Sequence, residues 1–113
     1  MTITEKIFAL RRSEPFDRLR DSELTIIAEV TQERQYSPGE TIISSEKSLQ
    51  NLYIVVQGSV QNSGGNTVPH VFGIKSLLFN VPLTSLLNAS PEEGAVCLLI
   101  GKGHFFGIRR KFG

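Results

Sequence analysis

The feature that most constrains the fold is a succession of short apolar and β-branched runs between residues 33 and 100. Runs end at turn sequences such as Ser37-Pro38-Gly39, where proline and glycine suit the two central positions of a β-turn. Many short strands at close spacing are typical of a β-sandwich or of a β-barrel such as a jelly roll. We therefore expect strands at the following segments: 33–36, 41–44, 52–56, 59–61, 68–72, 84–89 and 95–100.

A helix is predicted at the N-terminus. Thr2 and Glu5 have the spacing of a capping box, in which each side chain bonds the other residue's backbone N–H. Apolar residues at helical spacing continue the pattern to Arg11-Arg12. Pro15 ends the helix, because proline has no backbone N–H and its ring clashes with the preceding turn.

A second helix is expected to begin near Asp21 or Ser22, since either side chain can accept a bond from a free N–H of the first turn. Residues at helical spacing give this helix an apolar stripe: Leu24, Ile27 and Ala28. Phe16 and Leu19 lie just before the helix and are the expected core anchors beneath it.

The length and composition describe a single domain. The chain has 113 residues, of which 40% are apolar and 20% are charged, values that are ordinary for a globular protein with one core. A net charge of +1 creates no field that would attract nucleic acid or an acidic membrane. The one basic cluster, Arg109-Arg110-Lys111, fits a solvated helix end. We expect neither a nucleic-acid nor a membrane partner.

The single cysteine indicates a cytoplasmic location. Cys97 has no second cysteine to pair with, and it lies in an apolar run where it serves as a small buried residue. No apolar run approaches the ~18–20 residues that span a bilayer. The first residues also lack the basic and apolar regions of a secretion signal.

Four segments carry a family resemblance: FDRLRDSEL from Phe16, YSPGETII from Tyr36, LYIVVQGSV from Leu52 and FGIKSLLFNVPLTS from Phe72 to Ser85. In their order and spacing they resemble the cyclic-nucleotide-binding domain family. The resemblance implies a mainly β fold with flanking helices, a jelly-roll β-barrel of the cupin-like type. Residues 1–113 then form one domain, with a helical entry at 1–31, a barrel at 33–100 and a short helix at 102–113.

The last of these segments, residues 72–85, matches the phosphate-binding cassette of the family, which reads roughly FGE-x-A-L-L-x-x-x-P-R-[AT]-A. Ile74 stands where the family has its sugar-binding glutamate, and Leu83 stands where it has its phosphate-binding arginine. Each hydrogen bond to a charged group contributes ~1.5–3 kcal/mol, so the loss of both contacts weakens binding by several powers of ten. Cyclic-AMP binding is therefore expected to be lost.

Two further departures concern the loop before Tyr53 and the C-terminus. Family members usually carry a glycine around the position of Glu46-Lys47, and this chain has none there. In the family, a further helix caps the base of the barrel after the last strand. Residues 102–113 leave room for one short helix, which Gly103 and Gly107 weaken, so we expect a fold shortened at its C-terminus.

The candidate ligand-binding residues are those of the cassette: Phe72, Gly73, Ile74, Lys75, Ser76, Leu83, Thr84 and Ser85. In one interpretation Ile74 and Leu83 fill the old pocket, and Lys75 points to solvent. In the other, the backbone N–H groups after Gly73 and the hydroxyl of Thr84, at a position that favours guanine in some family members, hold cGMP, another nucleotide or a small anion.

An enzymatic function is not supported. A metal-dependent cupin enzyme needs clustered histidine and carboxylate ligands, but His70 and His104 are far apart in sequence. The serines have no recognisable histidine and acid partners, and Gly101-Lys102-Gly103 is not a phosphate loop. We expect no metal and no cofactor, with a cyclic nucleotide as the one candidate ligand.

Surplus aromatic residues indicate a protein partner. Four apolar side chains near the cassette and the C-terminus exceed what a small core needs, or else pack under the last helix: Phe79, Val81, Phe105 and Phe106. The sequence thus predicts a non-catalytic regulatory or interaction module that acts through another protein chain or self-association. The alternative is a functional small-ligand sensor.

Overall fold

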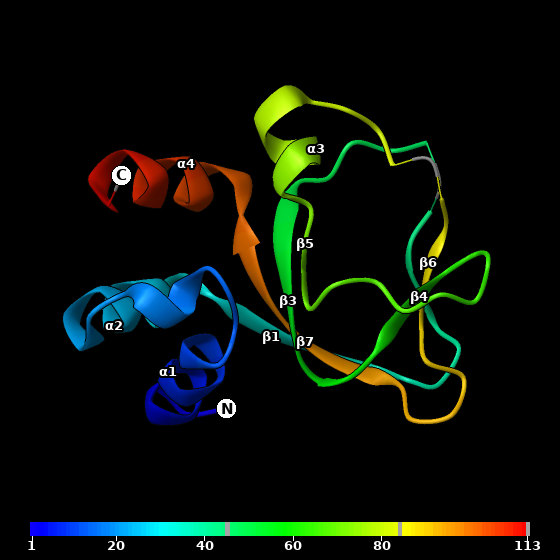
Figure 1. Cartoon of the computed structure of the whole chain (residues 1–113), viewed down its shortest axis with the longest axis horizontal. Helices are drawn as coiled ribbons and strands as arrows, with labels where there is room; N and C mark the ends of the chain where they lie inside the picture. The colour runs from blue at the N-terminus through cyan, green and yellow to red at the C-terminus, as the bar shows by residue number, and fades with distance from the viewer. Residues whose placement is uncertain (45, 84, 113) are drawn as a thin grey trace.

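Three helical segments gather at one end of the molecule: α1 (Ile3–Arg11), the 3₁₀ turn η1 (Phe16–Arg18) and α2 (Asp21–Val30) (Figure 1). The computed structural model describes residues 1–44, 46–83 and 85–112. The predicted capping box of α1 is confirmed. The Glu5 amide donates to Thr2 Oγ1 at 3.1 Å, and the Thr2 amide donates to Glu5 Oε1 at 2.8 Å.

The start of α2 differs from the prediction. Arg20, rather than Asp21 or Ser22, occupies the N-cap position, and its amide donates to Glu23 Oε1 at 2.9 Å. The prediction of an Asp21 or Ser22 cap was therefore wrong, by one or two residues. Asp21 lies in the first turn instead, where its negative charge complements the helix dipole. The predicted stripe is confirmed, because all three of its members are buried: Leu24, Ile27 and Ala28.

In the described part of the chain, seven strands form two antiparallel sheets: β1 (Gln32–Tyr36), β2 (Thr41–Ile43), β3 (Asn51–Gly58), β4 (Val60–Asn62), β5 (Val71–Phe72), β6 (Leu87–Ala89) and β7 (Ala95–Gly101). The four-stranded sheet has the order β1-β7-β3-β5, and the three-stranded sheet has the order β2-β6-β4. A bulge interrupts the register of β3 against β7 between Val55 and Gln57.

Two strands are three residues shorter than the sequence pattern indicates, and β2 ends one residue earlier than expected, at Ile43. β5 begins at Val71 rather than at residue 68, since Pro69 has no N–H to contribute to a ladder. β6 begins at Leu87 rather than at residue 84. In front of it the Ser85 hydroxyl lies 2.9 Å from that of Ser63.

The core is continuous across the four-stranded sheet. Helices cover one face of this sheet, and the three-stranded sheet covers the other (Figure 1). Neighbouring residues of β7 alternate between the two faces and are all almost fully buried: Cys97, Leu98, Leu99 and Ile100. A strand that is apolar on both faces holds the two halves of the molecule together. The mainly β architecture with flanking helices is thus confirmed.

The chain ends in α4 (Lys102–Phe112), an eleven-residue helix despite its two glycines. Phe105 and Ile108 pack against the core from this helix, which contacts β3 and β7. Within the described residues, no helix is long and apolar enough to cross a membrane.

Candidate functional site

The second residue of the cassette is a glycine that no other residue can replace without strain. Gly73 follows β5 with φ +105° and is the N-cap of α3 (Ile74–Phe79). A Cβ atom at this position would lie 2.8 Å from Leu49 Cδ1 and 3.3 Å from the Asn51 carbonyl oxygen. The chain therefore needs glycine here both for its backbone conformation and for the close approach of β3.

Helix α3 is fixed to the barrel by its inner face. Leu77 is 1% exposed and Ser76 is 3% exposed. The Ser76 Oγ accepts a hydrogen bond from the Leu49 amide at 2.9 Å. This bond joins the cassette to the loop before β3, and a role for Ser76 in ligand binding stays a prediction.

The end of the cassette pairs with the same loop. We call residues 46–49 the strap. The Leu83 amide donates to the Lys47 carbonyl oxygen at 3.2 Å, and the Glu46 amide donates to the Leu83 carbonyl oxygen at 2.7 Å. The Ser48 hydroxyl reaches the Asn80 carbonyl oxygen at 3.4 Å. The strap thus holds the following segment of the cassette through backbone groups and the helix through the hydroxyls of Ser76 and Ser48.

Ile74 and Leu83, at the two positions where the family resemblance predicts ligand contacts, face different surroundings. Ile74 is half-buried and lines an apolar cavity of about 340 Å³ together with Phe105 and Ile108 of α4. Leu83 is half-buried, packs against the core and is bonded to the strap. Both side chains are therefore part of the apolar packing of the domain.

The other predicted site residues are only partly brought together. Phe72 stacks on Tyr53 with ring centroids 5.0 Å apart and planes 5° from parallel. Lys75 is exposed, and Ser85 bonds Ser63. Thr84 lies outside the described residues.

A cation that the sequence reasoning missed lies elsewhere in the barrel. Arg34 of β1 is opposite Cys97 in the ladder and is close enough to lower the pKa of both Tyr36 and Tyr53. Burial outweighs this effect and raises the pKa of both tyrosines above their ordinary value. The cassette motif does not indicate Arg34 as a site residue, because Arg34 belongs to the edge strand β1 and lies outside the cassette.

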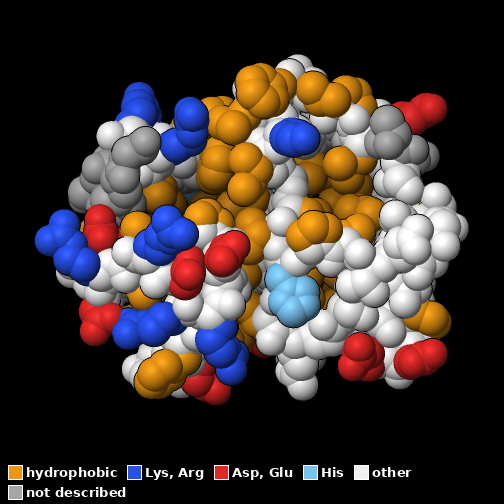
Figure 2. Space-filling model, viewed as in Figure 1, with side chains coloured by type: hydrophobic (Ala, Val, Ile, Leu, Met, Phe, Trp, Pro, Cys, Tyr) orange, Lys and Arg blue, Asp and Glu red, His pale blue; other side chains and the backbone are white. Residues whose placement is uncertain are grey.

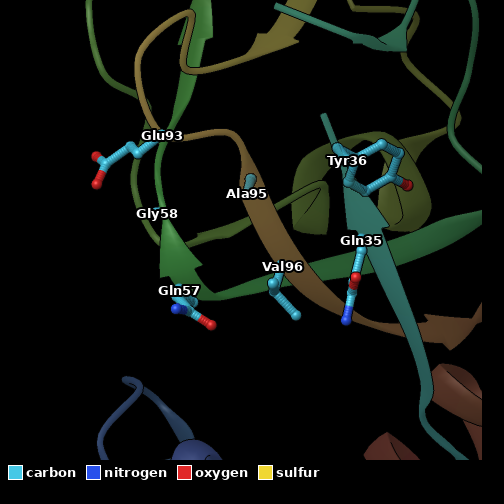
Figure 3. A pocket seen from close by; sticks show the side chains of 7 residues that line it. All are labelled: Gln35, Tyr36, Gln57, Gly58, Glu93, Ala95 and Val96. Atoms are coloured by element: carbon cyan, nitrogen blue, oxygen red, sulfur yellow. The ribbon is translucent and has the colours of Figure 1, made fainter. Parts of the chain in front are cut away.

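A second hollow, of about 330 Å³, opens on the helix-facing side of the four-stranded sheet (Figure 3). Gln35, Gln57 and Val96 point into it, and the Tyr36 ring lies on the other side of its strand. Its lining is polar and does not include a residue of the cassette. We assign it no role.

No protein-family model matches the sequence, and no curated protein matches it. Solved structures do match. The regulatory domain of Toxoplasma gondii PKA with cAMP superposes with a TM-score of 0.77 at 22% identity, over 94% of this chain and 44% of that one. A putative cyclic nucleotide-binding protein from Geobacter metallireducens gives 0.72 at 24% identity, over 91% and 80%.

The chain has the fold of a cyclic-nucleotide-binding domain. The jelly roll expected from the four sequence segments is thereby confirmed. The domain spans less than half of the Toxoplasma structure that it matches. A further match is the regulatory subunit of a cAMP-independent protein kinase A from Trypanosoma cruzi bound to guanosine, with a TM-score of 0.74 at 20% identity over 91% of this chain and 40% of that one.

Proposed function

We propose that this domain is a non-catalytic regulatory module whose cassette does not bind cAMP with ordinary affinity. The observation that carries the proposal is the surroundings of Ile74 and Leu83. Both side chains belong to the apolar packing of the domain, and neither supplies a charge for a ribose hydroxyl or a cyclic phosphate. The frame of the cassette is retained, since Gly73, α3 and the strap are joined by close contacts and hydrogen bonds.

A cyclic phosphate would find no counter-charge at position 83. A negatively charged group placed against Leu83 would lose water without gaining a counter-charge, which is costly. Within the described part of the cassette, Lys75 is the charged residue, and its side chain is exposed, where salt screens its attraction. Screened charges of this kind contribute about 0–1 kcal/mol, too little to replace a bidentate arginine contact.

A regulatory module must act on a partner. Phe79, the last residue of α3, is 70% exposed, and Val81, two residues later, is 50% exposed. By contrast, Phe105 and Phe106 are half-buried, and their rings contact each other edge to face. We propose another protein chain or a second copy as the partner, with Phe79 and Val81 in the contact. The absence of an enzymatic activity and the cytoplasmic location remain predictions.

The alternative function is a small-ligand sensor that uses Gly73, Ser76 and Thr84, the last of which lies outside the described residues. The guanosine complex of the Trypanosoma cruzi subunit favours an uncharged nucleoside over a nucleotide for this alternative. A nucleoside has no phosphate, so a leucine at position 83 carries no electrostatic cost. The regulatory subunit of a cAMP-independent protein kinase A from Trypanosoma brucei is bound to cAMP as a triple mutant, and one of its three substitutions introduces an arginine. This complex is the reason for testing an arginine at position 83.

Calorimetric titration with cAMP, cGMP and guanosine tests the proposal on the wild type and on Leu83→Arg. We expect no cAMP binding tighter than about 100 μM in the wild type, and a gain of at least about tenfold in Leu83→Arg, the effect of one charge-assisted contact. Val81→Arg adds the same charge two residues away at an exposed position and should gain nothing. The double variant Ile74→Glu/Leu83→Arg is secondary, because a carboxylate at position 74 faces an apolar cavity.

Micromolar cAMP binding by the wild type would overturn the proposal and direct attention to Arg34 and Lys75 as counter-charges. Micromolar guanosine binding without cAMP binding would establish the sensor alternative. If Leu83→Arg gains no more cAMP affinity than Val81→Arg, the cassette cannot bind cAMP even with the arginine restored. The proposal of a regulatory module then rests on protein partners alone.

A further inference from the structure

An apolar cavity lies under α4, against the first residue of the cassette helix. It has a volume of about 340 Å³ and is lined by residues from η1, α2, α3, β3, β7 and α4. Its floor is rigid, because Ile27, Leu52 and Ile100 are each no more than 1% exposed. Cavities of this size and composition are typical of sites for small molecules.

The walls of the cavity come from three different helical segments: η1, α3 and α4. Leu19 follows η1, Ile74 begins the cassette helix, and Phe105 and Ile108 face inward from α4. All four side chains are half-buried, so they are accessible from the opening. Figure 2 shows hydrophobic side chains gathered between α3 and α4, and Lys and Arg side chains on the α4 side.

One charged residue lines this otherwise apolar cavity. Arg109 is exposed at the rim and, within the described residues, forms no ion pair. The described part of α4 carries further positive charge at Lys102 and Arg110 and has no acidic residue. An apolar hollow with a guanidinium at its mouth is complementary to a molecule that has an apolar body and a single anionic head.

We propose that this cavity binds a small amphipathic carboxylate, such as a medium-chain fatty acid, with its chain between α4 and the barrel and its carboxylate on Arg109. The guanidinium donates hydrogen bonds to the carboxylate at the cavity mouth, where water remains on one side. The apolar chain displaces water from the floor that Ile27, Leu52 and Ile100 form. A macromolecular helix is a poorer fit, because a volume of about 340 Å³ holds a small molecule rather than several turns of helix.

Such a ligand would touch the cassette and α4 at the same time. Ile74 is the first residue of α3, and Phe105 and Ile108 belong to α4. Occupancy would therefore favour whichever arrangement of these two helices leaves the cavity open. The binding proposal itself is independent of what the cassette binds.

The experiment follows backbone amide chemical shifts by NMR during titration with octanoate and, separately, with 1-octanol. In the wild type we expect saturable octanoate binding with a Kd below about 1 mM, and shifts at Ile74, Phe105 and Ile108. Arg109→Gln should weaken octanoate binding by about threefold to tenfold, as expected for one solvent-exposed charged contact, and leave 1-octanol unaffected. Arg110→Gln removes an equal charge from the neighbouring exposed position and is the matched control.

Three results would overturn the proposal. The first is a wild type without saturable octanoate binding. The second is a set of shifts that lies in the three-stranded sheet rather than around the cavity. The third is an equal loss in Arg109→Gln and Arg110→Gln, which would indicate general attraction to a basic helix. Both substitutions are at exposed positions, so the fold is expected to be intact in each variant.

Discussion

At the scale of single residues, Glu46 stands out for its backbone conformation. Its φ of 66° lies in the left-handed region, where a side chain with a Cβ costs about 1–2 kcal/mol. The conformation is imposed by tertiary contacts, since the Glu46 amide donates to the Leu83 carbonyl oxygen and the next residue accepts from the Leu83 amide. The missing glycine noted in the sequence is thus a position where the strap is strained to meet the cassette.

We expect Glu46→Gly to stabilise the domain by about 0.5–1 kcal/mol, since glycine relieves the strain but has more entropy to lose on folding. Lys47→Gly is the control, because position 47 has no positive φ and a glycine there should destabilise by a similar amount. Urea denaturation of the two variants measures both effects. A loss of stability in Glu46→Gly would show that the glutamate side chain has a compensating contact.

At the scale of elements, α4 shows how packing overcomes weak helix propensity. Gly103 and Gly107 disfavour a helix, yet α4 runs from Lys102 to Phe112 because Phe105 and Ile108 pack against the core. A Cβ added at Gly107 would meet no atom within 4 Å. The helix therefore tolerates a better helix former there without repacking.

Gly107→Ala should stabilise the domain by about 0.5–1 kcal/mol, the usual preference for alanine over glycine inside a helix. The same substitution at Gly73 should have the opposite sign and cost at least about 1–2 kcal/mol, because φ is +105° and the new Cβ would clash with Leu49. Thermal unfolding of both variants checks this pair. A stabilising Gly73→Ala would contradict the cassette geometry described above.

At the scale of the whole molecule, stability rests on the apolar layer on both sides of β7. Cys97 lies at the centre of this strand and is fully buried. Burial raises the pKa of the Cys97 thiol from its ordinary 9.0 to about 11. The unfolded chain therefore loses this proton first as the pH rises.

The resulting stabilisation is fully present below about pH 9 and is lost as the pH rises toward about 11, by roughly 2–3 kcal/mol in total. Cys97→Ala lacks this dependence, so it should lose much less stability than the wild type by pH 11. Near pH 8 it should be less stable than the wild type, because the substitution removes a buried sulfur atom and leaves a small cavity. Tyr36 and Tyr53 titrate in both proteins, and the main cause of their raised pKa, burial, is common to both, so most of their contribution cancels in the difference. Parallel pH dependence of the two unfolding curves would contradict the burial of the thiol.

The fold could be predicted from the sequence because its signals are local. Turn residues such as Pro38 and Gly39 delimit strands, the capping box at Thr2 starts a helix, and the sequence motif of the cassette indicates α3. The errors arose where a competing local group took over. The Arg20 amide donates to the Glu23 side chain, so Arg20 rather than Asp21 is the N-cap of α2. Pro69 has no N–H to contribute to the ladder, so β5 begins later than expected.

The candidate site was predictable only in part. The sequence by itself determined that positions 74 and 83 are apolar, and this follows from residue identity alone. Only the tertiary structure decided that Ile74 lines a cavity under α4, that the strap bonds Leu83, and that Arg34 approaches two tyrosines. Those contacts join segments far apart in the chain, and their geometry depends on how the sheets and helices pack, which no local pattern encodes.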